Sequence, residues 1–467
     1  MRRNAVLLFA LFLTLQVSGL AQSPAGAAQK VEYYALEDVR AGQKGTARTV
    51  FAGAEPQEFG LEVLGVLPGF PAPRKSVIIA RLSGKEVERT SVFAGMSGSP
   101  VYIDGKLVGA IAYAFPFAKE PIAGITPIRQ MVEMFEQGRQ SSGGRDQLGF
   151  PREPRAVSYS QLSGDGWKSL LPQGQAGGVS FVAPVATGSP LAALLGQQFA
   201  PIATPLVFNG FSPQSVSLFT PQLQSQGLLP VAGVGGASAI TPLGKVTEQT
   251  LGPGTSVSVE LVRGDFTVAA SGTVTHRDGG QIYAFGHPFL SLGSADMPMS
   301  ESKVVTVIPN TLNSFKLSVP GQMVGSISQD RSTGIYGNLG RAPKMIPVTI
   351  NLHTSRDHVE TFRYEVANDE FLTPLLLNMT VYSTLTSSER SLGDSTVSVR
   401  GRIEVKGQET ITLERRFSMQ GAAISAAGSV AGPVQALMSS GFEGVELGPI
   451  TLDIAAADSR RVASLDR

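Results

Sequence analysis

The chain has 467 residues, of which 42% are hydrophobic and 16% are charged, enough apolar material for two to four domains. The formal net charge is +1 and no basic block occurs, which argues against a nucleic-acid-binding surface. The absence of cysteine excludes disulfides, a thiol nucleophile and cysteine-based metal sites. The 53 glycines and 30 prolines, with few helical patterns, favour an all-β protein.

The N-terminus has the pattern of an export signal. Two arginines precede an almost wholly apolar run over residues 5–20, and small residues follow at a cleavage-like site. The run is short for a membrane span, so we expect residues 1–21 to be a signal peptide, with a retained N-terminal anchor as the alternative. No later stretch is long and apolar enough to cross a bilayer. We therefore expect an exported protein, periplasmic or secreted, without a stable membrane span after cleavage.

Strand patterns follow one another closely over residues 31–136. They cover residues 46–51, 59–66, 76–82 and 101–113. Asp104 and Gly105 form a pair typical of a hairpin turn, and a short helix is expected near residues 128–136. This spacing predicts a small β-barrel.

The region between residues 137 and 245 is less regular. Residues 137–153 are polar and rich in glycine, serine and arginine, which predicts a linker. The rest contains the only tryptophan, Trp167, and is expected to be a connecting module with a helix near residues 215–227.

Regular alternation resumes in residues 246–346, with hairpin turns expected at residues 263–265 and 278–280. The opening Gly-Thr pair loosely echoes the first β unit, which indicates two similar barrels. Long alternating strands after residue 347 predict a β-sandwich-like domain over residues 347–467, which could continue beyond the last residue. This domain is also a candidate surface for a protein partner.

Residues 95–100 read Gly-Met-Ser-Gly-Ser-Pro and lead into a strand. Small residues let a backbone approach a substrate closely, and the backbone N–H groups of Gly95 and Ser97 could hold an oxyanion. Ser97 is at the centre of the turn, whereas Ser99 precedes a proline and is conformationally restricted. A turn without chemistry is the alternative, since short motifs recur by chance.

A serine nucleophile requires a base, and the chain has four histidines. His353 and His358 fall in polar settings and are expected at the surface, and His276 lies just before a hairpin. His287 follows a glycine at the exit of an apolar strand, which suits a loop at the end of a barrel; a histidine with a purely structural role is the alternative. None of these histidines has the spacing of a metal site, so neither a metal nor another cofactor is expected.

These motifs resemble the SpoIVB peptidase family, serine proteases of sporulation signalling and their exported relatives. Two blocks carry the resemblance: residues 42–131 with the serine turn, and residues 272–337 with Phe285-Gly286-His287. The resemblance implies two trypsin-like β-barrels, with Ser97 as nucleophile and His287 as base, and a protein substrate.

The chain departs from the family pattern in two ways. The serine block precedes the histidine block, the reverse of the family order, which exchanging two packed barrels would permit. Where the family has an acidic residue before the serine, this chain has Arg81-Leu82-Ser83. Glu86 and Glu88 lie close to that position in the sequence. The possible acidic partners of His287 in its own unit are Asp278 and Asp296.

Two functions remain open. The first is an exported serine endopeptidase acting through an acyl-enzyme. The second is a catalytically inactive relative that serves as an envelope or secreted scaffold for protein binding, which the missing acid and the large additional β region would suit. The pairing of the Ser97 turn with His287 favours the peptidase.

Overall fold

The computed structural model describes residues 31–116, 118–141, 199–224, 226–233, 240–354, 358–388, 394–441 and 445–459. The expected signal peptide and Trp167 lie outside these ranges, as does most of the expected linker. By its internal contacts the chain from Tyr33 onward forms one compact unit.

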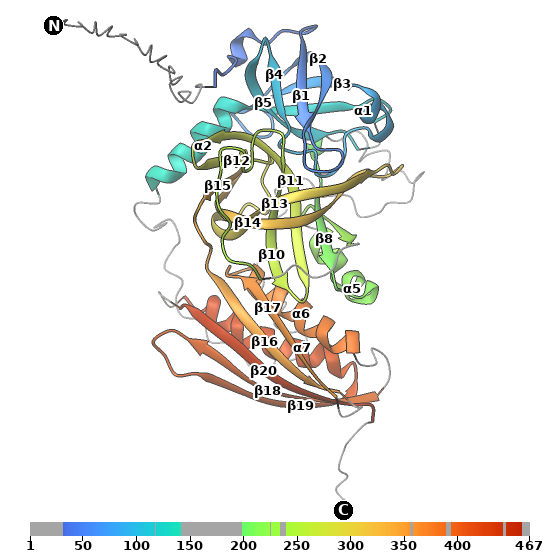
Figure 1. The fold of residues 1–467 in the computed structure, drawn as a ribbon, viewed down its shortest axis with the longest axis vertical. Helices are drawn as coiled ribbons and strands as arrows, with labels where there is room; N and C mark the ends of the chain where they lie inside the picture. Colours follow the sequence, from blue (N-terminus) through green and yellow to red (C-terminus); the bar gives the residue numbers. More distant parts are fainter. Residues whose placement is uncertain are drawn as a thin grey trace, which may run out of the picture. The chain divides into compact units, whose positions relative to one another are not determined.

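The first six strands close into an antiparallel barrel (Figure 1). They are β1 (Lys44–Thr49), β2 (Gln57–Pro68), β3 (Ser76–Ser83), β4 (Pro100–Ile103), β5 (Lys106–Ala114) and β6 (Ile122–Pro127). In β2, alternate residues Phe59, Leu61 and Val63 are buried, as expected of a strand with one face in a core. Asp104 and Gly105 both have positive φ, as the turn of a two-residue hairpin requires.

Three short helical segments accompany this barrel: η1 (Leu36–Asp38), α1 (Lys85–Thr90) and α2 (Ile128–Ser141). The expected helix is α2, which extends into the region predicted as a linker. Its buried residues Met131 and Phe135 join a small core with Tyr283 and Tyr336, and the rings of Phe135 and Tyr336 stack at 5.5 Å. The helix therefore connects the first barrel to strands of the second.

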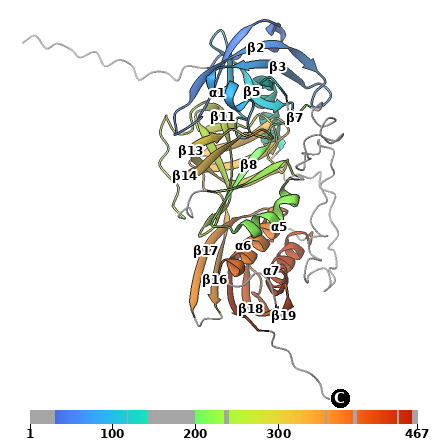
Figure 2. The same cartoon turned by 90° about the vertical axis from the view of Figure 1, so that its right-hand side faces the viewer.

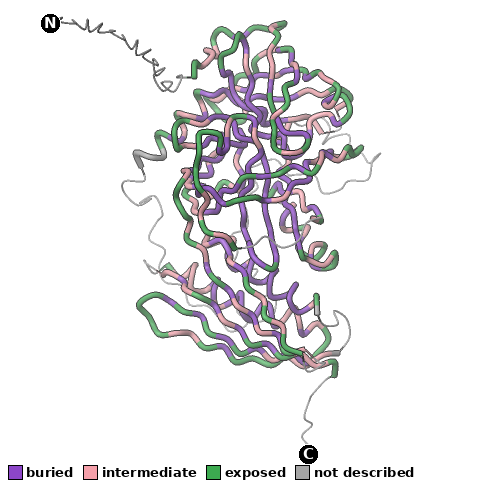
Figure 3. The backbone as a smooth tube through the Cα atoms, viewed as in Figure 1, coloured by how far each residue is buried: buried purple, intermediate pink, exposed green. Residues whose placement is uncertain are grey.

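A second ring of six antiparallel strands follows. The strands are β10 (Ser256–Gly264), β11 (Thr267–Asp278), β12 (Gln281–Ala284), β13 (Gly293–Ile308), β14 (Phe315–Arg331) and β15 (Gly334–Leu339). Numbered in chain order within each ring, both barrels have the strand order 1-2-3-6-5-4, closed between strands 4 and 1 of the series. The sequence prediction of two similar barrels is thus confirmed. Strand β10 is buried along its whole length (Figure 3).

Four short elements lie between the barrels in the sequence: β7 (Ala200–Pro201), β8 (Thr204–Asn209), α5 (Pro213–Gln224) and β9 (Leu228–Ala232). Strand β7 pairs with β5 of the first barrel, and β8 pairs with β11 of the second. Helix α5 lies where the sequence predicted one. The connecting segment thus adds one strand, β7, to the first sheet and two, β8 and β9, to the second.

The C-terminal strands extend the second sheet through pairing of β17 with β10. They are β16 (Met345–His353), β17 (Val359–Ala367), β18 (Asp394–Val405), β19 (Ile411–Gln420) and β20 (Leu447–Ala457). Helices α6 (Leu372–Ser388) and α7 (Ala422–Met438) cover one face of these strands (Figure 2). The β strands of this region were predicted correctly, but the layer packed on them is helical rather than the second sheet of a sandwich.

The two helices explain why the sequence pattern suggested a sandwich. Both are buried around their circumference over two turns or more, since every residue of 426–432 in α7 and of 376–385 in α6 is buried. A helix buried on most sides lacks the polar face that reveals a 3.6-residue period. In the part of the chain that the structure describes, no helix is long and apolar enough to span a membrane.

Candidate active site

Ser97 lies in the connection between the third and fourth strands of the first barrel. Gly95 and Gly98 on either side have φ of +91° and +94°, a region that side-chain-bearing residues rarely adopt. The N–H of Met96 donates to the Phe93 carbonyl at 3.0 Å, and the N–H of Ser99 donates to the Met96 carbonyl at 3.1 Å. Gly95 and Gly98 therefore allow a tight turn with Ser97 at its centre.

His287 lies in the equivalent connection of the second barrel, between its third and fourth strands. Phe285 and Gly286 before it have φ of 71° and 73°. The ring Nδ1 is 2.8 Å from the carbonyl oxygen of Pro288. A carbonyl can only accept, so Nδ1 carries the proton of the neutral ring and Nε2 keeps its lone pair, which is the tautomer a base needs.

Burial dominates the acid–base behaviour of His287. The residue is 2% exposed, and desolvation lowers the pKa of the imidazole to about 4, although the hydrogen bond to the Pro288 carbonyl acts in the opposite direction. The imidazole is therefore neutral at physiological pH.

The serine turn packs against the second barrel, at β11 and at Phe285, two residues before His287. The N–H of Thr273 donates to the Ser97 carbonyl at 2.9 Å, and the hydroxyl of Thr275 donates to the Gly98 carbonyl at 2.8 Å. A Cβ on Gly98 would lie 2.6 Å from the backbone nitrogen of Phe285. Gly98 is thus required for the contact between the two barrels as well as for the turn.

Two buried polar side-chain atoms on these segments have no hydrogen-bond partner, the Oγ of Ser97 and the Nε2 of His287. Both residues are buried, at 0% and 2% exposure. They are not hydrogen-bonded to each other in this structure. A buried polar atom without a partner is costly, so each one calls for an explanation, and a role in a reaction is one such explanation.

Two backbone donors complete the arrangement. In the part of the chain that the structure describes, the N–H groups of Gly95 and Ser97 have no acceptor, whereas those of Met96, Gly98 and Ser99 do. Paired N–H groups beside a serine hydroxyl can stabilise negative charge that develops on a carbonyl oxygen.

Neither of the acidic residues suggested by the sequence hydrogen-bonds to His287. Asp296 accepts from the guanidinium of Arg341 at 3.3 Å and from the N–H of Lys344 at 2.9 Å. Asp278 lies at the hairpin between β11 and β12, where its charge opposes the desolvation that lowers the pKa of His276. The Pro288 carbonyl occupies the place at Nδ1 that these carboxylates were expected to take.

A different carboxylate organises the histidine loop. Asp330, near the end of β14, is 1% exposed and accepts the N–H groups of Phe289, Leu290 and Leu292 at 2.8, 2.7 and 3.2 Å. Desolvation raises the pKa of this carboxyl to about 6, against the lowering effect of the backbone donors. Asp330 therefore fixes the loop that supplies the Pro288 carbonyl.

Asp330 was not among the residues predicted from the sequence, because it lies far along the chain from His287 and in no motif. The available signal was an acidic residue near the end of a long strand pattern, directly before a hairpin.

The other histidines have structural or surface positions. The Nε2 of His276 is 3.1 Å from the hydroxyl of Tyr33, and its ring stacks on Tyr283. His353 and His358 are exposed, as expected. Among the described residues, no group of histidine, aspartate and glutamate side chains is close enough together to hold a metal ion.

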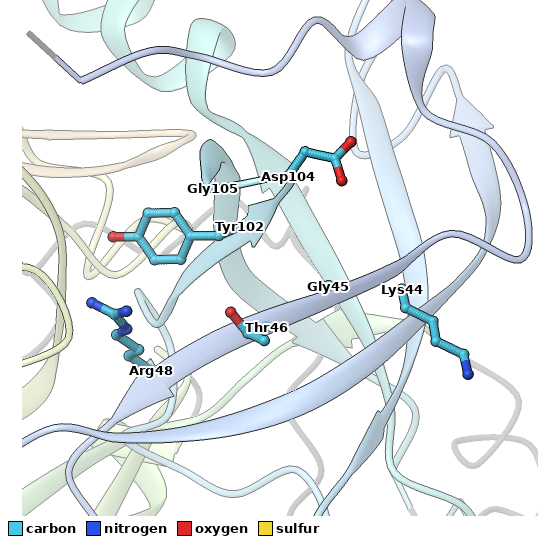
Figure 4. Close-up of a pocket in the computed structure, with 7 residues that line it drawn as sticks. All are labelled: Lys44, Gly45, Thr46, Arg48, Tyr102, Asp104 and Gly105. Atoms are coloured by element: carbon cyan, nitrogen blue, oxygen red, sulfur yellow. The ribbon is translucent and has the colours of Figure 1, made fainter.

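A surface pocket of about 440 Å³ lies on the first barrel (Figure 4). Residues of β1 and of the β4–β5 hairpin line it, and Ser97 and His287 are not among them. The guanidinium of Arg48 is 5.4 Å from the centre of the Tyr102 ring, and it also pairs with Glu58 at 3.1 Å. The pocket is therefore separate from the contact between Ser97 and the histidine loop.

Comparison with known proteins identifies one family. Residues 18–131 match the family model of the SpoIVB peptidase S55, about a quarter of the chain. The matched segment includes Gly95 and Ser97 and ends before His287. The match confirms the resemblance to this serine peptidase family that the sequence suggested. No curated protein and no solved structure gives a significant match.

Proposed function

We propose that this protein is a serine endopeptidase of the SpoIVB type, with Ser97 as nucleophile and His287 as general base. The observation that carries the proposal is the pair of buried, unpartnered atoms, Ser97 Oγ and His287 Nε2, on two segments that meet where Gly98 approaches the backbone nitrogen of Phe285. The family match of the serine segment supports the class of reaction.

The reaction follows from the chemistry of these groups. The Oγ of Ser97 attacks the scissile carbonyl while its proton moves to Nε2 of His287, and the N–H groups of Gly95 and Ser97 hold the oxyanion. Collapse breaks the C–N bond, the imidazolium returns the proton to the leaving amine, and an acyl-enzyme remains. Water then attacks the ester, with His287 again as the base, and releases the acid and Ser97.

The surrounding residues orient the base. The Pro288 carbonyl fixes the tautomer of His287, and Asp330 holds the loop that carries this carbonyl. An orienting group that is not a carboxylate stabilises the imidazolium less, so we expect a slow enzyme. Because Ser97 is closed to solvent in this structure, a peptide reaches it only after the residues covering the turn move.

The proposal includes export to the periplasm or the medium, on the strength of the signal-like pattern in residues 1–21. The substrate is a protein, and the chemistry requires no cofactor. The sheet and helices after residue 345 are the candidate surface for a protein partner.

Labelling with a fluorophosphonate, which phosphonylates activated serines, tests the proposal. We expect wild type to be labelled, Ser97→Ala not to be labelled, and His287→Ala to be labelled at least 100-fold more slowly, as for other nucleophile–base pairs. Ser99→Ala is the matched control. Its hydroxyl donates to the Met96 carbonyl at 2.5 Å rather than facing the reaction, so most labelling should persist.

The competing function is an inactive relative that acts as a binding scaffold. It is favoured by the absence of a hydrogen bond between Ser97 and His287 and by the lack of an acidic residue at the family position. A wild type that is never labelled, or a Ser97→Ala variant labelled as fast as wild type, would leave the scaffold as the better account.

A further inference from the structure

Lys316, at the start of β14, is a buried cation that the proposed reaction does not use. It is 0% exposed, and its Nζ lies 3.3 Å from the hydroxyls of both Thr49 and Thr273. These are its only hydrogen-bond partners among the described residues, and no carboxylate forms an ion pair with it. Burying an ammonium without a counter-ion is strongly unfavourable, so such a lysine calls for a functional explanation.

The side chain runs directly behind the serine turn. The backbone N–H of Lys316 donates to the Ala94 carbonyl at 2.8 Å, and a Cβ on Gly95 would lie 2.8 Å from the Lys316 Cβ. The hydroxyl of Thr273 donates to the Gly95 carbonyl at 3.1 Å, and the N–H of Thr273 donates to the Ser97 carbonyl at 2.9 Å. Lys316 is thus one hydroxyl away from the peptide group between Gly95 and Met96, inside the serine turn.

We propose that Lys316 is a positioning residue for acyl transfer at Ser97. Held by the two threonine hydroxyls, it fixes the Gly95 carbonyl through Thr273 and places its positive charge behind the oxyanion donors. The inference rests on the proposed peptidase function and adds a group that the family resemblance did not suggest. The anion that the buried ammonium lacks in this structure is the oxyanion formed during the reaction.

The charge of Lys316 can change near neutral pH. Desolvation lowers the pKa of its amine to about 7, and it is the one cause of the shift. Charged or titratable side chains on β1, β11, β13 and β14 contribute nothing to it. They are Lys44, Arg48, His276, Arg277, Asp278, Asp296, Glu301, Lys303, Asp330 and Arg331. Strand β8 and the serine turn carry no charged residue.

The labelling rate depends on the protonation of two groups, Lys316 and His287. The ammonium form assists the reaction and is present below the pKa of Lys316, whereas His287 must be neutral and is so above its own pKa. The labelling rate of wild type with a fluorophosphonate should therefore fall again as pH rises through about 7. A residue that only fills space would give no such alkaline decrease.

The experiment compares labelling rate constants of the full chain across pH for wild type and Lys316→Met. Methionine has a similar length and no charge, so it preserves the packing. We expect the alkaline decrease to vanish and the maximal rate to fall about tenfold, less than the ~100-fold cost of losing a direct oxyanion donor. Lys303→Met, an exposed lysine on the neighbouring β13, is the matched control and should behave as wild type.

A second variant separates position from charge. Thr273→Val removes the hydroxyl between Lys316 and Gly95, so the rate should fall while the alkaline decrease remains. A Lys316→Met variant with the rate and pH profile of wild type would overturn the inference. A second result would also overturn it. If the wild-type labelling rate increased as pH rises through about 7, and this increase were absent in Lys316→Met, Lys316 would be the proton acceptor. A wild type that is unlabelled at every pH removes the proposed function itself.

Discussion

His287 holds the ring nitrogen on which the proposed reaction depends, and its burial sets the pH at which that nitrogen is available. An exposed histidine has a pKa of about 6.5, whereas desolvation lowers the pKa of this ring to about 4. Because the neutral ring is the base, we expect the labelling rate to be lost only below about 4, falling roughly tenfold for each further pH unit.

The measurement is the rate constant of fluorophosphonate labelling on the acid side of neutrality, with native folding verified by circular dichroism at each pH. The pKa of His287 is lower in the folded state than in the unfolded state. The native state therefore also loses stability as pH falls from the unfolded pKa toward the folded pKa of this ring. A rate that already halves near 6.5, with the fold intact, would contradict the buried position of the base.

At the level of single residues, the sequence predicted the two groups that lie in motifs. Ser97 stands out because glycine and proline surround it, and His287 because it follows a glycine at a strand exit. Asp330 and Lys316 could not be predicted in the same way. Their roles depend on which strands meet in space, and an acidic or basic residue in a strand is normally assigned to a solvated face.

Among the structural elements, the turn containing Gly98 packs tightly against the second barrel. A Cβ at this position would lie 1.9 Å from the Thr273 carbonyl oxygen, and its φ of +94° is unfavourable for alanine. We expect Gly98→Ala to lower the free energy of unfolding by about 2–5 kcal/mol, the sum of backbone strain and overpacking. Urea denaturation of the two proteins measures this difference.

Gly105→Ala is the matched control for this prediction. Gly105 also has a positive φ, +74°, but a Cβ there would meet nothing within 4 Å. Only backbone strain remains, about 1–2 kcal/mol. Equal losses for the two variants would mean that the tight contact between Gly98 and the second barrel does not persist in solution.

Strands were easier to predict from the sequence than the two C-terminal helices, for a physical reason. Strands such as β2 alternate between core and surface, so their pattern is visible in the sequence. The buried helices α6 and α7 have no polar face, and α6 also contains several threonines, which are typical of strands. The closed order of each barrel also depends on pairings between distant strands, which local patterns do not encode.

At the scale of the whole molecule, β10 connects the second barrel to the C-terminal sheet. This strand belongs to the ring of the second barrel and also pairs with β17 of the C-terminal sheet. The two rings share one strand order, with the serine turn and the histidine loop at corresponding connections. A reversed order of the two blocks along the chain is therefore compatible with one composite site, because either ring can precede the other.

The junction between the second barrel and the C-terminal sheet contains a buried ion pair. The Nε of Arg263 on β10 lies 2.6 Å from a carboxylate oxygen of Glu365 on β17, and their side chains are 7% and 21% exposed. Removing one member leaves the other charge buried without its partner. We expect Glu365→Ala to lower the free energy of unfolding by about 3 kcal/mol.

An exposed pair in the same sheet provides the control. Arg400 and Glu414 are 3.4 Å apart with side chains 77% and 78% exposed, so Glu414→Ala should change the free energy of unfolding by about 0.5 kcal/mol at most. Urea denaturation at low and high salt measures both variants. The loss in Glu365→Ala should persist at high salt, because water and ions do not screen a buried charge. If the two variants lose equally little, the ion pair does not hold the C-terminal sheet to the barrel, and the backbone pairing of β10 with β17 must do so alone.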